Sequence, residues 1–216
     1  MLCFGGSFNP VHRAHLACSA AAARAAGFDR VRLILAARPP LKDDRSAIAS
    51  VEDRLSMLRL AAADAAAPTE AAMRDVTYLI DDRETRRPGP SYTIDTVHEL
   101  LAEGERVDWL IGADQLLWLP RWHRVDELLA AARFWVMARP GYAIDWPAMP
   151  SVVRGLADRV VIVPQMDVSA TDIRRGLREG TSIAHLVTPS VDRYLREHRL
   201  YADSGALIDP SRNDDP

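Results

Sequence analysis

The fold is decided by one N-terminal stretch, Leu2-Cys-Phe-Gly-Gly-Ser-Phe-Asn-Pro-Val-His-Arg-Ala-His-Leu16. In it a short apolar run leads into Gly5 and Gly6, the pair Asn9-Pro10 follows, and an alanine-rich segment begins near His12. Paired glycines permit backbone angles and close approaches that a Cβ atom would block. Proline cannot continue a strand and restricts the residue before it. The stretch therefore predicts a strand, a tight turn and a helix.

The predicted helix start is suited to binding an anion. Its first N–H groups have no partner within the helix and point back at the glycine turn. His12 and His15 are three residues apart, so their imidazoles lie on one face of the helix. A His-x-x-His pair alone is more often structural than catalytic, and no third ligand at metal-binding spacing accompanies this one. Beside a glycine turn, we interpret the pair as part of a polyphosphate site and predict no metal held by the protein.

Composition narrows the class of protein. A chain of 216 residues with 48% hydrophobic residues is enough for one domain with a real core. The net charge of −3 argues against a large nucleic-acid-binding surface. Two cysteines, Cys3 and Cys18, make neither a disulfide framework nor a zinc cluster, and we expect both to be buried. No apolar run reaches the ~18 residues of a membrane span, and no basic leader is present, so we expect a cytoplasmic protein.

Apolar runs alternate with helical segments along most of the chain. The expected strands are residues 2–4, 31–36, 73–80, 107–112, 133–138 and 159–163. The expected helices are residues 14–26, 51–66, 93–102 and 169–178, a short helix after 113, and a last one from 188. This alternation predicts an α/β fold with a doubly wound parallel sheet, in which ligands bind at the carboxyl ends of the strands.

We expect a single domain over residues 1–202. Within it, residues 165–202 form a small C-terminal helical part that carries site residues. Residues 203–216 are polar and show no periodicity, which predicts a disordered tail.

Cations for the phosphates must come from elsewhere in the chain, because neither G-x-x-x-x-G-K-[ST] nor G-x-G-x-x-G is present. Lys42 follows a Pro-Pro pair after the second strand, and Arg174 lies at the start of a predicted helix. Ser169 and Thr171 can cap that helix and face a phosphate placed at its end. The alternative is that the lysine and the arginine are surface residues and the two hydroxyls are caps only.

These segments resemble known motifs. The first stretch resembles the signature of the nucleotidyltransferase superfamily, GG(S/T)F(D/N)PxHxxH. Six further segments look like motifs of bacterial nicotinate-nucleotide adenylyltransferases, in the same order: Pro39–Lys42 (PPHK), Ser91–Thr96 (SYTxDT), Leu110–Asp114 (IIGxD), Leu119–Trp122 (LxxW), Ala138–Gly141 (RPG) and Val168–Arg174 (ISSTxIR).

The resemblance covers nearly all of residues 1–201, with three departures. Leu41 replaces a histidine and Ala170 replaces a serine of the family motifs. Only four residues precede Gly5, fewer than is usual in the family, so we expect the natural start a few residues earlier.

The resemblance implies a Rossmann-like nucleotidyltransferase in which the phosphate of nicotinate mononucleotide attacks the α-phosphorus of ATP. The products are deamido-NAD, an intermediate of NAD biosynthesis, and pyrophosphate. The attacking phosphate is already ionised near neutral pH, so catalysis needs positioning and charge stabilisation rather than a general base. Mg²⁺ is expected on the ATP phosphates. The expected partners are the two nucleotides and, as one possibility, further copies of the chain, but neither nucleic acid nor membrane.

The same resemblance implies the site residues. The catalytic residues would be His12, His15, Lys42 and Arg174. The ATP site would comprise Gly5, Gly6, Ser7, Phe8, His15, Gly112, Asp114, Ser169, Thr171 and Arg174. The mononucleotide site would comprise Asn9, Lys42, Ser91, Tyr92, Thr93 and Trp122. Of these, Trp122 would stack on the pyridine ring, and the helix start at Thr93 would offer N–H groups to the ring carboxylate.

Several alternatives stay open at this point. The acceptor could be nicotinamide mononucleotide or phosphopantetheine, although SYTxDT and the tryptophan argue against the latter. A non-catalytic nucleotide-binding regulator could share the fold. Trp122 could belong to the core, and Asp114 could be a helix cap. We interpret the other tryptophans, Trp109, Trp118, Trp135 and Trp146, as packing residues and assign nothing to His98, His123, His185 and His198.

Overall fold

A computed structural model describes residues 1–40, 48–67, 70–73 and 75–202. Lys42 and the predicted tail lie outside the described residues. The described strands form one parallel sheet in the order β3-β2-β1-β4-β5-β6. Their bounds are β1 Leu2–Gly6, β2 Arg30–Leu35, β3 Thr77–Asp81, β4 Asp108–Gly112, β5 Arg133–Ala138 and β6 Val160–Ile162. The predicted doubly wound sheet is confirmed.

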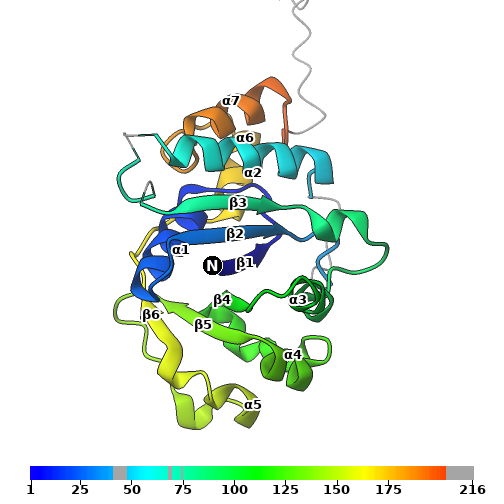
Figure 1. Ribbon diagram of the computed structural model, residues 1–216. Helices are drawn as coiled ribbons and strands as arrows, with labels where there is room; N and C mark the ends of the chain where they lie inside the picture. The colour runs from blue at the N-terminus through cyan, green and yellow to red at the C-terminus, as the bar shows by residue number, and fades with distance from the viewer. Residues whose placement is uncertain (41–47, 68–69, 74, 203–216) are drawn as a thin grey trace, which may run out of the picture.

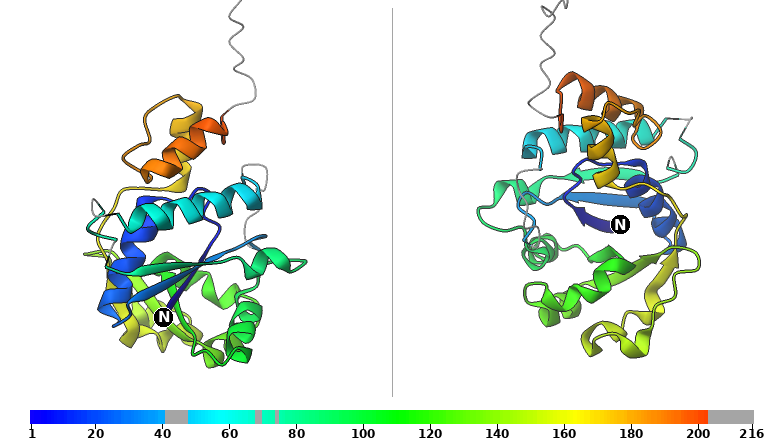
Figure 2. Two further views of the ribbon diagram at one scale, coloured as in Figure 1. Left: turned by 45° about the horizontal axis from the view of Figure 1, so that its top comes forward. Right: turned by 180° about the vertical axis from the view of Figure 1, so that it is seen from behind.

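Helices cover both faces of this sheet (Figure 1). The α-helices are α1 Arg13–Ala25, α2 Val51–Ala65, α3 Thr93–Ala102, α4 Val125–Ala131, α5 Ser151–Arg154, α6 Ala170–Arg178 and α7 Pro189–Glu197. Short 3₁₀ turns are η1 Arg83–Arg86, η2 Ala113–Leu117, η3 Leu119–Arg121, η4 Trp146–Ala148 and η5 Ala157–Arg159. In Figure 1, α2, α6 and α7 lie above the sheet, and α4 and α5 lie below it. Both views of Figure 2 show α7 beside α2.

The two faces of the sheet carry two hydrophobic cores. Along β1, Leu2 and Phe4 belong to the core that packs against α1 and α2, whereas Cys3 belongs to the core under α3 and α4. This follows from the two-residue period of a strand. A parallel sheet that is covered on both faces needs apolar side chains at consecutive positions, which explains the unbroken apolar runs of the sequence.

Most predicted elements have the expected bounds, and α3 and β5 match them to the residue. The predicted third strand is too long, because residues 71–73 and 75 lie in turns and only Thr77–Asp81 pairs with β2. The helices α4 and α5 were not predicted. They have seven and four residues, too few to produce a recognisable helical period.

The strand order sets the position of a ligand site. β1 lies between β2 and β4. The helix between β1 and β2 packs on one face of the sheet, and the helix before β4 packs on the opposite face. At such a switch point a crevice opens beyond the carboxyl ends of the central strands. Gly5 and Gly6 are the last two residues of β1 and pair with Ile34 and Leu35 of β2, so the predicted strand over residues 2–4 is too short. The turn that follows the two glycines, called the glycine turn below, therefore lies in this crevice.

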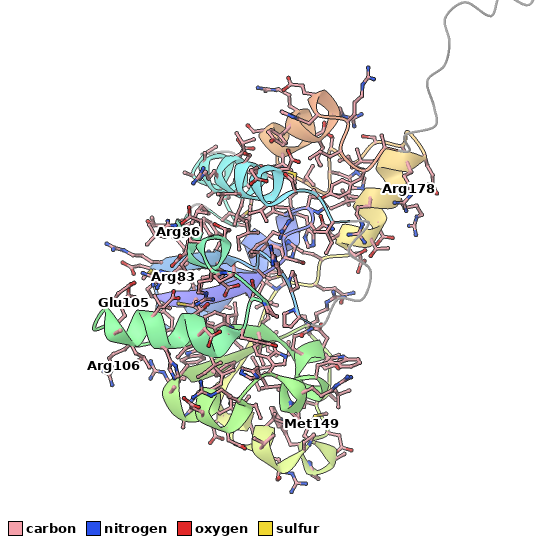
Figure 3. The ribbon with its side chains drawn as sticks, turned by 90° about the vertical axis from the view of Figure 1, so that its right-hand side faces the viewer. Arg83, Arg86, Glu105, Arg106, Met149 and Arg178 are labelled. Carbon is pink, nitrogen blue, oxygen red and sulfur yellow. The ribbon has the colours of Figure 1, made fainter. Side chains whose placement is uncertain are left out.

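Ion pairs fasten the β3 edge of the sheet to α3. Arg83 of η1 donates to Asp81 (2.8 Å) and to Glu103 (3.0 Å), and Arg32 of β2 donates to Glu105 (2.7 Å). Figure 3 shows Arg83 above the α3 end that leads to Glu105. These contacts fix the loop between β3 and α3, which forms one wall of the crevice.

The close packing of Gly5 gives a prediction for stability. A Cβ atom at Gly5 would lie 2.8 Å from Cζ2 of the buried Trp109 ring. We expect Gly5→Ala to lower the free energy of unfolding by about 1–3 kcal/mol, the range for overpacking a core. Urea denaturation measures this. The matched control is Gly155→Ala, where the backbone is helical and an added Cβ meets nothing within 4 Å, so equal losses in both variants would contradict the packing argument.

Candidate active site

The buried ring of Phe8 packs against the glycine turn. Phe8 has a left-handed φ of 42° and a buried ring, and a Cβ atom at Gly6 would lie 3.0 Å from that ring. Glycine is therefore required at position 6 by close approach. The side chain of Phe8 packs in the core, so its predicted contact with ATP would have to come from the backbone. The following Asn9-Pro10 bond is cis.

His12 and His15 meet at the start of α1. Their rings are stacked with centroids 3.6 Å apart and planes 25° apart, which confirms that they share one face of the helix. The backbone N–H of His12 donates to Nδ1 of His15 (3.2 Å). Because Nδ1 accepts, the proton of a neutral His15 ring resides on Nε2. This hydrogen bond fixes the orientation of the His15 ring.

His12 is buried at the N-cap of α1. Burial lowers its pKa from 6.5 to about 4, so this imidazole is neutral at pH 7 in the free protein. Within the described part of the chain, its Nδ1 atom has no hydrogen bond of full geometry, although the ring faces the backbone N–H of His15 in a capping box. A buried polar atom of this kind usually has a partner, which a bound phosphate would supply.

Two cavities open near the two histidines and the glycine turn. One, of about 590 Å³, is lined by Gly5, Gly6 and Ser7 together with the start of α3 and the residues around η3. The other, of about 430 Å³, is lined by both histidines, by the end of β4 and by the segment after β6. Two neighbouring cavities suit two substrates that must react with each other.

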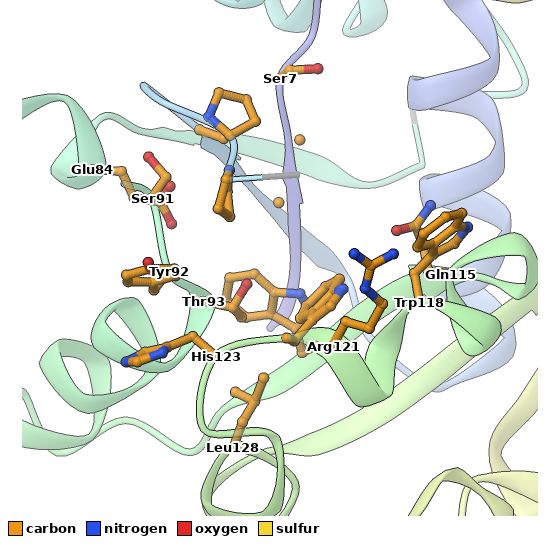
Figure 4. A pocket seen from close by; sticks show the side chains of 17 residues that line it. Ser7, Glu84, Ser91, Tyr92, Thr93, Gln115, Trp118, Arg121, His123 and Leu128 are labelled. Carbon is orange, nitrogen blue, oxygen red and sulfur yellow. The ribbon is translucent and has the colours of Figure 1, made fainter. Parts of the chain in front are cut away.

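The first cavity has aromatic walls, which Figure 4 shows. The ring of Tyr92 stacks on His123 at 4.2 Å, and the half-buried Trp122 makes a T-shaped contact with Phe134, with ring centroids 6.5 Å apart. Arg121 lies over the ring of Trp118, 5.1 Å from its centroid. Trp118 is 48% exposed and lines the cavity, so the prediction that it is a packing residue is wrong.

The start of α3 borders the same cavity through Ser91, Tyr92 and Thr93. Tyr92 is the N-cap of α3, and no side chain of the described residues caps its N–H groups. A buried carboxyl, Glu84, accepts from the Thr96 hydroxyl (2.6 Å), and burial raises its pKa. Glu84 lines the same cavity, so this contact holds the start of α3 at the cavity wall.

The second cavity includes the end of β4. Gly112 and Asp114 both line it, and a Cβ atom at Gly112 would collide with the Asp114 carboxylate. Gln115 donates to that carboxylate (2.8 Å). Glycine at 112 is therefore needed for the carboxylate to keep this position.

The C-terminal part also reaches the turn. Nη1 of Arg174 donates to the backbone oxygen of Asn9 (2.7 Å), and Nη2 donates to the Thr171 hydroxyl (3.3 Å). Ser169 is the N-cap of α6, where its hydroxyl oxygen accepts from Asp172 N–H (3.1 Å). The predicted cap is confirmed, and Arg174 lies beside the glycine turn although 165 residues separate it from Asn9.

Comparison with known proteins assigns the chain to a family. The model of the cytidylyltransferase-like family matches residues 3–176. The chain belongs to the cytidylyltransferase-like family. A probable nicotinate-nucleotide adenylyltransferase of Herpetosiphon aurantiacus is 36% identical over 201 residues, which cover 91% of this chain and 96% of that protein. Another, of Synechococcus sp. (strain JA-3-3Ab), is 38% identical over 207 residues, which cover 92% of this chain and 93% of that protein.

A solved structure supports the fold. Nicotinic acid mononucleotide adenylyltransferase of Plasmodium falciparum, complexed with NaAD, superimposes with a TM-score of 0.71 over 93% of this chain and 96% of that one, at 15% identity. The predicted resemblance to nucleotidyltransferases and the predicted Rossmann-like fold are confirmed.

Of the predicted site residues, most line one of the two cavities. The first cavity receives Gly5, Gly6, Ser7, Ser91, Tyr92, Thr93 and Trp122. The second receives His12, His15, Gly112 and Asp114. Arg174 of α6 contacts the turn at Asn9, whereas Lys42 lies outside the described residues. The predicted site residues that line neither cavity are Phe8, Asn9, Ser169, Thr171 and Arg174. The binding roles themselves stay predictions.

Arg54 is a site residue that the sequence analysis missed. It is 1% exposed, and its guanidinium donates to four backbone oxygens, those of Ser7, Ala36, Ala37 and Ala49, at 2.7–3.1 Å. It thereby joins the glycine turn to the segments after β2 and before α2. One signal was available: position 54 belongs to the buried stripe of α2, which is otherwise apolar at Met57, Leu58 and Ala61.

The described residues contain no group of three or more histidine, cysteine, aspartate or glutamate side chains that could hold a metal ion. They also contain no helix that is long and apolar enough to cross a membrane. Cys3 is buried as expected, whereas Cys18 is half-buried and borders the second cavity.

The buried state of His12 predicts a pH dependence of stability. Its folded pKa of about 4 lies below 6.5, so the unfolded state takes up a proton first as the pH falls through the window from 6.5 to 4. Between pH 7.5 and pH 5, we expect the wild type to lose about 2 kcal/mol more unfolding free energy than His12→Gln.

Urea denaturation of both proteins without substrates, at the two pH values, measures this difference. The remaining histidines are common to both proteins and cancel in the comparison. Parallel pH profiles would mean that His12 is charged in the folded protein.

Proposed function

We propose that the protein transfers the AMP group of ATP to nicotinate mononucleotide, with deamido-NAD and pyrophosphate as products. The observation that carries this proposal is the pair of cavities near the glycine turn and the stacked His12–His15 pair. A transfer between two nucleotides needs two adjoining sites with donors for phosphate oxygens near their boundary. The similarity to probable nicotinate-nucleotide adenylyltransferases over nine-tenths of the chain supports the same reaction.

In this proposal ATP occupies the second cavity, beside His12 and His15, and the mononucleotide occupies the first. The mononucleotide phosphate would then approach the α-phosphorus across the glycine turn. Backbone N–H groups and glycines let both phosphates come close to the chain without a Cβ between them. Holding the two anions in line supplies much of the rate, because a bimolecular step becomes a positioned one.

His15 would stabilise the charge that develops during transfer. Its Nδ1 accepts from the His12 backbone, so Nε2–H is the group that faces a phosphate oxygen. His12 would contact the phosphates beside it, and the bound anion would give its Nδ1 a partner. Arg174 and Lys42 would hold the β- and γ-phosphates, since a guanidinium binds phosphate through two parallel hydrogen bonds.

The nicotinate ring would bind between the aromatic walls of the first cavity, with Trp122 and Tyr92 as stacking surfaces. Its carboxylate would accept from the N–H groups at the start of α3. A charged acceptor gains more from these donors than an amide does, which is the physical basis for preferring the acid.

The ATP substrate is taken as its magnesium complex. With no cluster of metal ligands among the described residues, the ion would be held mainly by the phosphates. A cytoplasmic location and a homo-oligomeric state stay predictions.

Acceptor specificity tests the reaction directly. Pyrophosphate release is measured with magnesium-ATP and, in separate reactions, nicotinate mononucleotide, nicotinamide mononucleotide and phosphopantetheine. We expect kcat/KM for the nicotinate acceptor to exceed that for the amide by about 10- to 100-fold, the scale of a charge-assisted hydrogen bond. Preference for another acceptor would keep the reaction class and change the substrate. Binding of ATP without release in any reaction would support the regulator instead.

Loss of the His15 donor tests the mechanism. We expect His15→Ala to lower kcat by a factor of about 10² or more, the cost of removing one transition-state donor. His98→Ala is the matched control: this imidazole is half-exposed on α3, pairs with Glu127 and borders neither cavity. An unchanged kcat in pure, folded His15→Ala would remove His15 from the mechanism.

A further inference from the structure

Asn9, the last residue before the cis proline, is contacted by three segments that are distant in the sequence. The hydroxyl of Tyr201 donates to its Oδ1 atom (2.6 Å), and the backbone N–H of Ala49 donates to the same oxygen (3.0 Å). Nη1 of Arg174 donates to its backbone oxygen (2.7 Å). Asn9 itself is 4% exposed. The glycine turn is thus held at its far end by one buried residue and its neighbours.

Tyr201 reaches Asn9 because the chain reverses after α7. Leu200 N–H donates to Leu195 O (3.0 Å), and Arg199 and Tyr201 both have left-handed φ values, 48° and 63°. The phenol ring is half-buried against the core that contains α1 and α2. Burial raises the pKa of this hydroxyl, so it is a protonated donor at neutral pH. Arg174 and Arg54 are close enough to act on it electrostatically.

The C-terminal part does not depend on this hydrogen bond for its attachment. Ser190 donates twice to Asp64 of α2, through its N–H and its hydroxyl (both 2.8 Å). Arg13 of α1 donates to the backbone oxygens of Leu186 and Val187 (3.0 and 2.9 Å). Together with the buried Val191 and Leu195, these contacts hold α7 on the domain. The Tyr201 hydroxyl is therefore directed at the turn rather than needed for docking.

We infer that Tyr201 is a positioning residue of the transfer reaction: its hydroxyl fixes Asn9, and through Asn9 it fixes the glycine turn and the Arg174 guanidinium. This inference rests on the proposed function. Arg174 can bind a phosphate in a defined direction only if its other contact, the Asn9 backbone oxygen, is itself fixed. A small displacement of a group that orients a substrate can cost a large factor in rate.

Tyr201→Phe tests the inference, because it removes one hydroxyl and keeps the ring. We expect kcat/KM for magnesium-ATP to fall about tenfold, on the scale of a positioning defect, and KM for nicotinate mononucleotide to change less than about twofold. Tyr194→Phe is the matched control. It removes the hydroxyl of another C-terminal tyrosine, which donates to Asp53 of α2 (3.0 Å) and not to Asn9, and it should keep kcat/KM within about twofold.

A double-mutant cycle separates positioning from a general structural effect. If Tyr201 acts through Arg174, Tyr201→Phe should cost about tenfold in the wild-type background and less than about twofold in Arg174→Lys. Additive losses would overturn the inference. So would equal losses in Tyr201→Phe and Tyr194→Phe, because they would indicate loosening of the whole C-terminal part. Thermal melting of each variant checks that it is folded.

A direct measurement of magnesium-ATP binding distinguishes failure of this inference from failure of the proposed function. Calorimetry with magnesium-ATP needs no acceptor, so it applies even if no acceptor supports pyrophosphate release. Weaker binding of magnesium-ATP by Tyr201→Phe than by Tyr194→Phe supports the positioning role, whether the protein is a transferase or a nucleotide-binding regulator. Wild-type binding and wild-type rates in Tyr201→Phe would overturn it.

Discussion

The buried guanidinium of Arg54 is the interaction on which the site depends. A crevice at the ends of β1 and β2 leaves backbone oxygens that point inward, away from any strand partner, and buried oxygens of this kind need donors. Arg54 supplies hydrogen bonds to four of them, on three segments of the chain. These partners are neutral, so the positive charge stays beneath the glycine turn, where it favours an anionic ligand. One side chain therefore both shapes the turn and sets the sign of its electric potential.

The parallel sheet explains why two sites lie together. The crossover helices that lead to the two neighbours of β1 lie on opposite faces of the sheet. The turn after β1 therefore lies between the two cavities. The first cavity is lined by aromatic side chains from the segment before α3 and from the residues on either side of η3, and the second is lined by His12 and His15 at the start of α1. An aromatic ring and a polyphosphate need different cavity walls, and the topology supplies both at the end of one strand.

Local patterns of the sequence predicted the strands of the sheet, most helices and the shared helix face of His12 and His15, because each depends on residues within one turn of a helix or one strand. Contacts between distant segments were not predictable in this way. Nothing in the spacing of Asn9, Arg174 and Tyr201 indicates that they meet. Trp118 was misjudged for a related reason. It lies between two short 3₁₀ turns, where no period distinguishes an exposed ring from a buried one.

The proposed transfer reaction accounts for the kind of support that these residues receive. A phosphate nucleophile that is already ionised needs no base, so the chain has no proton to remove and its groups must instead be held in place. Three groups at the turn are held through a backbone atom: His15 accepts from the N–H of His12, Arg174 donates to the oxygen of Asn9, and the oxygen of Ser7 accepts from Arg54. Backbone partners move less than side chains do. A site built on them keeps its donors in one geometry before the substrates arrive, which is the condition for electrostatic stabilisation without reorganisation.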